Sequence, residues 1–131
     1  MTTSPTASAT VTVRPLAETD LAGADRIFRL AFGTFLGMPQ PEMFGGDADY
    51  IATRWRAEPE AALAAVRDGE LVGSNFVTHW GSVGFFGPLT VRPDLWDRGI
   101  AKALMGPTLA LLDERGVRLA GLFTFAHSPK H

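Results

Sequence analysis

The sequence predicts one α/β domain built on a mixed sheet. The chain has 131 residues, about the length of a single domain. Apolar residues make up 46% of it, enough for a hydrophobic core. Segments with the two-residue alternation of strands follow segments with helical spacing, in the order strand, helix, helix, three strands, helix, strand.

The first half is expected to hold a tail, a strand and two helices. MTTSPTASAT is rich in small polar residues that bury little surface, so residues 1–10 are expected to be a flexible tail before a domain at 11–131. TVTVRPL alternates β-branched residues as a strand does, whereas the segment after it carries apolar residues at helical spacing behind a capping Thr19 or Asp20. The expected elements are a strand at 10–16, helices at 18–36 and 47–57, and a loop at 37–46.

The second half is expected to begin with a hairpin. Asp68-Gly69 separates two apolar runs, and glycine accepts the positive φ of a tight hairpin turn. Pro88 cannot donate a ladder hydrogen bond, which implies a bulge or an edge in the third strand. Pro107 is expected to kink the long helix or to remove one of its hydrogen bonds. The expected elements are strands at 61–67, 70–80, 82–91 and 118–126 and a helix at 99–115, closed by Gly116.

Charge and composition disfavour several classes of protein. The net charge is −2, and no run of Lys or Arg exceeds two, so neither a nucleic-acid binder nor a protein of anionic membranes is expected. Cysteine is absent, which excludes disulfides and thiolate nucleophiles. The N-terminus lacks the charged start and apolar middle of a signal peptide. We therefore expect a cytoplasmic protein.

The turn before the last expected helix is a candidate anion site. A strand ends near Pro93, and Gly99 opens the helix after a short polar turn. The first N–H groups of a helix lack intrahelical partners, and the macrodipole adds partial positive charge there. Arg98 and Lys102 add cationic character. A phosphate or pyrophosphate fits such a site; the alternative is a glycine that only shapes a tight turn.

The segment LTVRPDLWDRGIAKAL resembles motif A of the GNAT acyl-CoA-dependent N-acyltransferases, whose pattern is R/Q-x-x-G-x-G/A after an apolar strand. Gly99 and Ala101 occupy the last two positions of that motif, and Trp96 stands where the family usually has Arg or Gln. VTVRPLAETDLAGADRIFRLAFG is similar to the first strand and helix of the family, and AVRDGELVGSNFV to its second and third strands. The resemblance implies a mostly antiparallel, twisted sheet flanked by helices.

The resemblance also implies a cofactor and a reaction. Acetyl-CoA would be the co-substrate, with no metal, and a primary amine would attack the thioester directly. A backbone N–H near Pro88–Leu89 would stabilise the oxyanion. The pantetheine arm would pair with the strand, and backbone amides at 98–102 would hold the pyrophosphate. The cofactor-binding residues implied are Leu89, Thr90, Val91, Trp96, Asp97, Arg98, Gly99, Ile100, Ala101, Lys102 and Ser128.

Other side chains are weaker candidates. His79 is the candidate catalytic base because its ordinary pKa lies near neutrality; the alternative is an ordinary strand histidine. His127 and His131 lie four residues apart but make a poor metal site, so no metal is expected. Four aromatic residues could line an acceptor pocket; the alternative is that they pack in the core. They are Trp55, Trp80, Phe85 and Phe86.

The C-terminal end differs from the family pattern. Ser128-Pro129-Lys130 resembles a turn that the family follows with a helix bearing a tyrosine and with two closing strands, so the domain is expected to be C-terminally incomplete. An open apolar strand edge invites pairing, which predicts a homodimer or a partner that covers 119–125. The favoured function is N-acetyl transfer. The alternatives are a non-catalytic acyl-CoA-binding or interaction module and a generic phosphate-binding domain, and the acceptor stays open.

Overall fold

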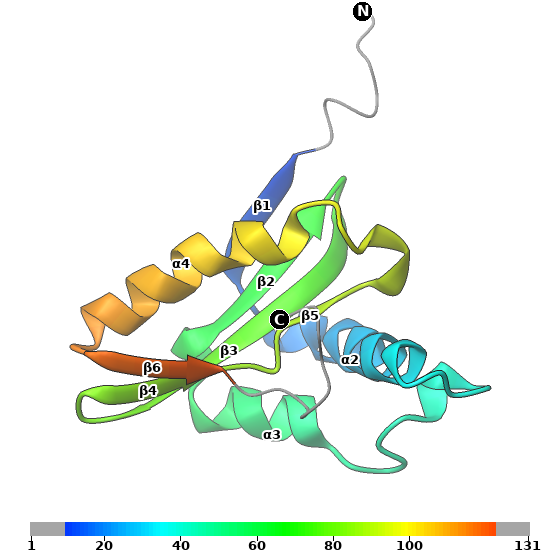
Figure 1. Cartoon of the computed structure of the whole chain (residues 1–131), viewed down its shortest axis with the longest axis horizontal. Helices are drawn as coiled ribbons and strands as arrows, with labels where there is room; N and C mark the ends of the chain where they lie inside the picture. Colours follow the sequence, from blue (N-terminus) through cyan, green and yellow to red (C-terminus); the bar gives the residue numbers. More distant parts are fainter. Residues whose placement is uncertain (1–9, 123–131) are drawn as a thin grey trace, which may run out of the picture.

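A six-stranded sheet organises the part of the chain that the computed structural model describes, residues 10–122 (Figure 1). Its order is β1-β2-β3-β4-β6, and β5 also pairs with β3. All pairings are antiparallel except β4 with β6. The strands are β1 (Val11–Pro15), β2 (Ala62–Arg67), β3 (Glu70–Trp80), β4 (Val83–Phe86), β5 (Thr90–Val91) and β6 (Leu119–Leu122), and the helices are α2 (Leu21–Phe35), α3 (Tyr50–Ala57) and α4 (Ile100–Glu114).

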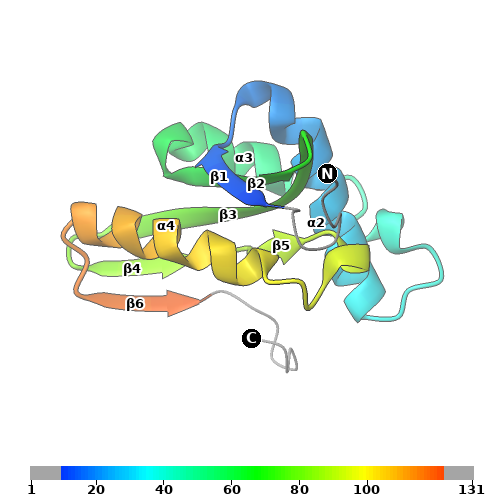
Figure 2. The same cartoon turned by 90° about the horizontal axis from the view of Figure 1, so that it is seen from above.

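Helices cover both faces of the sheet (Figure 2). Alternate residues of β2 show this division, because successive side chains of a strand point to opposite faces. Leu63 and Ala65 pack in a cluster with Leu104 of α4. Ala62 and Ala64 pack in a second cluster with α2 and α3. The continuous apolar run of β2 therefore reflects a strand that is buried on both sides.

The predicted order of elements is confirmed, including the hairpin. Asp68 and Gly69 form the turn between β2 and β3 with φ of +53° and +79°. The expected strand at 82–91 is two strands, β4 and β5, because the chain leaves the ladder at Gly87–Leu89 around Pro88. The expected last strand is described only as far as residue 122, and the tail predicted for 1–10 lies outside the described residues apart from Thr10.

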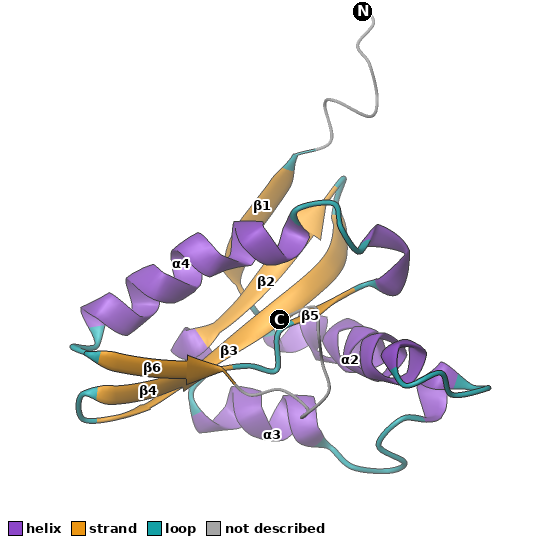
Figure 3. Cartoon of the chain, viewed as in Figure 1, coloured by secondary structure: helices purple, strands orange, loops and turns teal. Residues whose placement is uncertain are grey.

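Two helix predictions need correction. Asp20 stands at the N-cap position of α2, as predicted, but its side chain makes no capping bond to the helix; the carboxylate instead accepts hydrogen bonds from Arg14 and from the N–H of Ala17, in a 3₁₀ turn that precedes the helix. The helix expected at 47–57 begins only at Tyr50. For Pro107, the second of the two expected outcomes holds: α4 runs unbroken in Figure 3, and the missing N–H of Pro107 leaves the Ala103 carbonyl without its helical donor.

The two halves of the third predicted strand have different neighbours. Phe86 of β4 pairs with Val77 of β3 on one side and with Leu122 of β6 on the other. β5 pairs only with β3 among the described strands, through Thr90 and Val91. Within the described residues, the sheet is therefore open on the side of β5 that faces away from β3.

A buried polar pair links α4 to β3, and we expect its removal to destabilise the fold. The fully buried Thr108 hydroxyl accepts a hydrogen bond from Asn75 Nδ2 at 2.8 Å. Thr108→Val keeps the shape but leaves that amide hydrogen without its partner, which costs about 1–3 kcal/mol of unfolding free energy. Urea denaturation measures this loss of unfolding free energy, and Thr53→Val, at an exposed helical hydroxyl, is the control. Equal losses in both variants would contradict the assignment.

Candidate functional site

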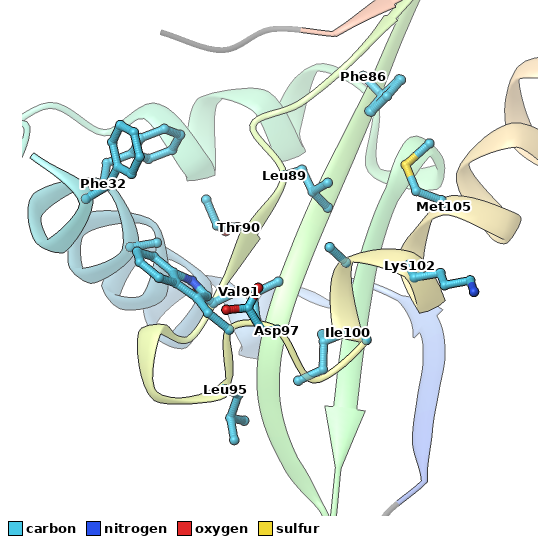
Figure 4. Close-up of a pocket in the computed structure, with 15 residues that line it drawn as sticks. Phe32, Phe86, Leu89, Thr90, Val91, Leu95, Asp97, Ile100, Lys102 and Met105 are labelled. Carbon is cyan, nitrogen blue, oxygen red and sulfur yellow. The ribbon is translucent and has the colours of Figure 1, made fainter. Parts of the chain in front are cut away.

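A cavity of about 440 Å³ lies where the sheet opens beside β5 (Figure 4). One wall comes from the C-terminal half of α2, a second from β4 and β5, and a third from the start of α4 with the turn before it. Most of its lining atoms are apolar. The lining residues are Ala31, Phe32, Phe35, Phe86, Leu89, Thr90, Val91, Leu95, Trp96, Asp97, Gly99, Ile100, Ala101, Lys102 and Met105.

The polar end of the cavity is the N-terminus of α4. Gly99 is the N-cap residue with a φ of +83°, a conformation that glycine adopts without steric cost. Gly99 has no side chain with which to cap the helix, and no acidic residue stands in the first turn of α4. The N–H groups of Ile100, Ala101 and Lys102 therefore lack helical acceptors, and the helix dipole favours an anion in front of them.

The turn that leads into α4 is fixed by side chains at both of its ends. The indole Nε1 of Trp96 donates a 2.8 Å hydrogen bond back to the carbonyl of Val91. Arg92 donates to both carboxylate oxygens of Asp94 and to Glu70. The Arg92 guanidinium holds the pKa of the Asp94 carboxyl below its ordinary value, and the same bond raises the pKa of Arg92. These contacts predispose the turn to one shape before any ligand arrives.

The Asp94 pair gives a prediction about pH. Because its folded pKa is depressed, Asp94 contributes stability above its unfolded pKa of about 4, and this contribution is lost as the pH falls through the folded value. Asp94 is 63% exposed, so the effect is below about 1 kcal/mol. Asp94→Asn should therefore lower the urea midpoint slightly at pH 7 and leave it unchanged at pH 2. Asp47→Asn, in an exposed loop, is the control; an equal loss at both pH values would contradict the pairing.

The open edge of β5 offers backbone groups to the cavity. The Arg92 N–H bonds to the Val72 carbonyl on the β3 side. Because successive residues of a strand point their backbone groups to opposite sides, those of Val91 point away from β3. The Val91 carbonyl indeed accepts the bond from Trp96, which leaves the Val91 N–H on the same edge.

Aromatic side chains close the other end of the cavity. Phe32 and Phe35 come from α2, and Phe86 comes from the end of β4. Figure 4 shows Phe32 and Phe86 at one end and Ile100 toward the other. The cavity thus combines an apolar end, an open strand edge and a helix N-terminus.

Most of the residues predicted for cofactor binding line this cavity. Arg98 does not line it, and Ser128 lies outside the described residues. The sequence reasoning missed the α2 wall, because apolar helical spacing identifies a buried face and not what lies against it. The predicted residues that line the cavity are Leu89, Thr90, Val91, Trp96, Asp97, Gly99, Ile100, Ala101 and Lys102, and those missed are Ala31, Phe32, Phe35, Leu95 and Met105.

His79 is not brought to the cavity. It pairs with Gly84 across β3 and β4, and paired residues share a face of the sheet. A Cβ at Gly84 would meet Leu112 and Val117, which places this face against the C-terminal part of α4. His79 Nδ1 is buried there without a hydrogen-bond partner in the described part of the chain.

The other aromatic and histidine candidates lie in different parts of the molecule. Trp55 belongs to the core, where its indole donates to the carbonyl of Leu16 at 2.8 Å, whereas Phe86 lines the cavity. His127 and His131 lie outside the described residues, and no group of three metal-ligating side chains occurs within 10–122. In the same range, no helix has the length and hydropathy of a membrane span.

Comparisons with known proteins agree with this architecture. Residues 25–130 match the model of the acetyltransferase (GNAT) family. Similar structures include a GNAT family acetyltransferase from Brucella melitensis in complex with acetyl-CoA (20% identity, 90% of this chain and 79% of that one, TM-score 0.66). The PaiA N-acetyltransferase of Thermoplasma acidophilum in complex with coenzyme A is also similar (16% identity, 92% of this chain and 83% of that one, TM-score 0.73). So is the ribosomal-protein-S18-alanine N-acetyltransferase of Escherichia coli (19% identity, 92% of this chain and 71% of that one, TM-score 0.69). No curated protein sequence gives a significant match. Because the family model matches well over half of the chain, the chain belongs to the acetyltransferase (GNAT) family.

Proposed function

We propose that the cavity binds acetyl-CoA and that the protein transfers the acetyl group to a primary amine by direct attack. The observation that carries this proposal is the junction, in one cavity, of an open strand edge at Val91 with the N-terminus of α4 at Gly99. An extended pantetheine arm suits the strand edge, and a diphosphate suits the helix N-terminus.

Each part of the cavity has a role in the proposed complex. The first N–H groups of α4 would hold the pyrophosphate, with Lys102 adding positive charge. The backbone of Leu89 and Val91 would pair with the arm, as an added strand does. A backbone N–H beside Pro88 would face the thioester oxygen and stabilise its developing charge.

The chemical step follows from this placement. The ammonium form of the amine first loses one proton. The neutral amine then forms an N–C bond to the thioester carbon, the C–S bond breaks, and the second proton lost by the nitrogen is taken up by the departing sulfur, so that CoA leaves as the thiol. Much of the acceleration would come from holding two reactants in attack geometry. Solvent would take the first proton, that of the ammonium, since His79 does not line the cavity.

Binding and turnover can be tested separately. Isothermal titration calorimetry with acetyl-CoA should give one site per chain, and ATP should not compete for it. Thiol release should then be measured with three probe amines: spermidine, Nα-acetyl-lysine amide and an alanine tripeptide with a free N-terminus. No heat with acetyl-CoA at millimolar concentration would overturn the proposed function.

A non-catalytic acyl-CoA-binding module is the second candidate. The observation in its favour is that the titratable side chains of the cavity, among the described residues, are Asp97 and Lys102, both beside the predicted pyrophosphate site. Neither lies at the aromatic end, where a base would be required. Acetyl-CoA binding without thiol release from any of the three probe amines would favour this candidate.

The edge of the sheet leads to a proposal about partners. β6 is the last strand of the sheet within the described residues, and it pairs with β4 on one side. An edge strand offers unpaired backbone groups to another chain. We propose that a second copy of the chain, or a partner, covers residues 119–125. Sedimentation of the isolated chain as a monomer would contradict the homodimer.

A further inference from the structure

The aromatic wall of the cavity is supported from behind by a second layer of rings. Phe32 lines the cavity, and its ring also packs edge-on against Phe28 with centroids 5.3 Å apart. Phe44 stacks on Phe32 at 5.6 Å and 24°. Phe44 comes from the segment between α2 and α3, which Figure 3 shows mostly as loop. The position of a cavity wall therefore depends on a loop residue outside the cavity.

One arginine holds that loop in place. Arg29 of α2 donates hydrogen bonds to the carbonyls of Phe44, Gly46 and Ala48. Its Nε donates to Asp25 one helical turn away, at 2.8 Å. The side chain is only 15% exposed. A planar guanidinium can serve several acceptors at once, and an ammonium on a flexible stem cannot do so in the same geometry.

The loop also lies directly against the helix that carries Phe32. A Cβ at Gly33 would collide with the backbone of Pro41, so the chain approaches α2 as closely as glycine allows. On the far side, Tyr50 of α3 stacks on Phe28 at 5.6 Å and 11°. Neighbours packed this tightly resist the rotation of the half-buried Phe32 ring.

We propose that Arg29 and Phe44 form a buttress behind Phe32 that sets the length of acyl chain the cavity accepts. This inference rests on the proposed function. With the pyrophosphate at Gly99 and the arm along β5, the acyl group would lie at the end bounded by Phe32 and Phe86. While Phe44 backs it, Phe32 cannot turn aside, and the site is restricted to short acyl groups such as acetyl. Arg29 is a positioning residue that acts through Phe44.

The test compares the binding of two cofactors rather than activity, so it needs no acceptor. Calorimetry gives the dissociation constants for acetyl-CoA and octanoyl-CoA in the wild-type chain and in Arg29→Lys, Phe44→Ala and Arg26→Lys. Arg26 is exposed on the same helix and makes the matched control. The wild-type chain should bind octanoyl-CoA at least about tenfold more weakly than acetyl-CoA, a ratio typical of steric discrimination by an apolar pocket. In Arg29→Lys and Phe44→Ala, the ratio of the octanoyl-CoA to the acetyl-CoA dissociation constant should fall close to one, while the acetyl-CoA dissociation constant changes little. Arg26→Lys should keep the wild-type ratio.

The outcomes separate the two proposals. No binding of acetyl-CoA by the wild-type chain overturns the proposed function and this inference with it. Normal acetyl-CoA binding with equal affinity for octanoyl-CoA in the wild-type chain overturns the inference alone, as does an unchanged ratio in the two variants. Should Phe44→Ala fail to fold, Arg29→Lys keeps every core ring and decides the question. A purely structural role for Arg29 would lower stability without altering the ratio.

Discussion

Replacing Gly99 with aspartate is expected to weaken acetyl-CoA binding by about 100-fold or more while the chain stays folded. A carboxylate at this position would stand beside the N–H groups that are proposed to hold the pyrophosphate. Two unit charges 4 Å apart repel by about 4 kcal/mol at an effective dielectric constant of 20. The same carboxylate would also interact with the helix dipole and so occupy the anion position itself. Calorimetry with acetyl-CoA measures the loss.

Two control variants separate charge from backbone strain. Gly99→Asn has a neutral side chain of similar size, and asparagine tolerates positive φ better than most residues. It should therefore weaken binding by less than about tenfold. Gly69→Asp places the same carboxylate at a φ of +79° in the β2–β3 turn, where a Cβ has open space. It should leave binding unchanged, because Gly69 does not line the cavity. Undiminished affinity in Gly99→Asp would remove α4 from the proposed site.

Local patterns were sufficient to predict the order of the elements and nine of the 15 residues that line the cavity. Asp68-Gly69 specified its hairpin because few residues tolerate left-handed φ. Gly99 was expected to open the last long helix, and it is the N-cap residue of α4. Pro88, which has no N–H to donate, predicted a bulge or an edge; the structure shows a larger change, with β4 and β5 as separate strands on either side of it. Each of these signals is chemistry within a few residues, which a sequence displays directly.

The parts that could not be predicted are contacts over long sequence separations. Arg29 reaches carbonyls 15 to 19 residues further along the chain, and an arginine on a helix carries no sign of which acceptors it will meet. The apolar residues at helical spacing predicted a buried face of α2, but they did not show that Phe32 and Phe35 of this helix also line a cavity. Trp96 was noted as a departure from the family pattern, yet its bond to the Val91 carbonyl depends on the fold of the whole turn.

Leu104→Ala is expected to reduce the unfolding free energy by about 2–5 kcal/mol, the range for a large buried aliphatic side chain that leaves a cavity. Leu104 is fully buried in the middle of α4, in the cluster that includes Leu63, Val72 and Val91. Leu109→Ala is the matched control on the same helix, because Leu109 is 55% exposed, and a substitution there should change stability by no more than about 0.5 kcal/mol. Urea denaturation without ligand measures both, and similar losses would contradict the packing of α4.

The same variant tests whether the helix positions the proposed cradle as a rigid unit. A ligand that binds only the folded state stabilises it by an amount set by its concentration relative to its dissociation constant, about 2.7 kcal/mol at 100-fold excess. If α4 keeps its orientation when Leu104 is truncated, acetyl-CoA should add the same increment to the variant as to the wild-type chain, although the variant starts from lower stability. A clearly smaller increment would mean that Leu104 also holds the first turn of α4 in its binding position. The difference between the two increments thus measures how far the core under α4 determines the geometry of the site.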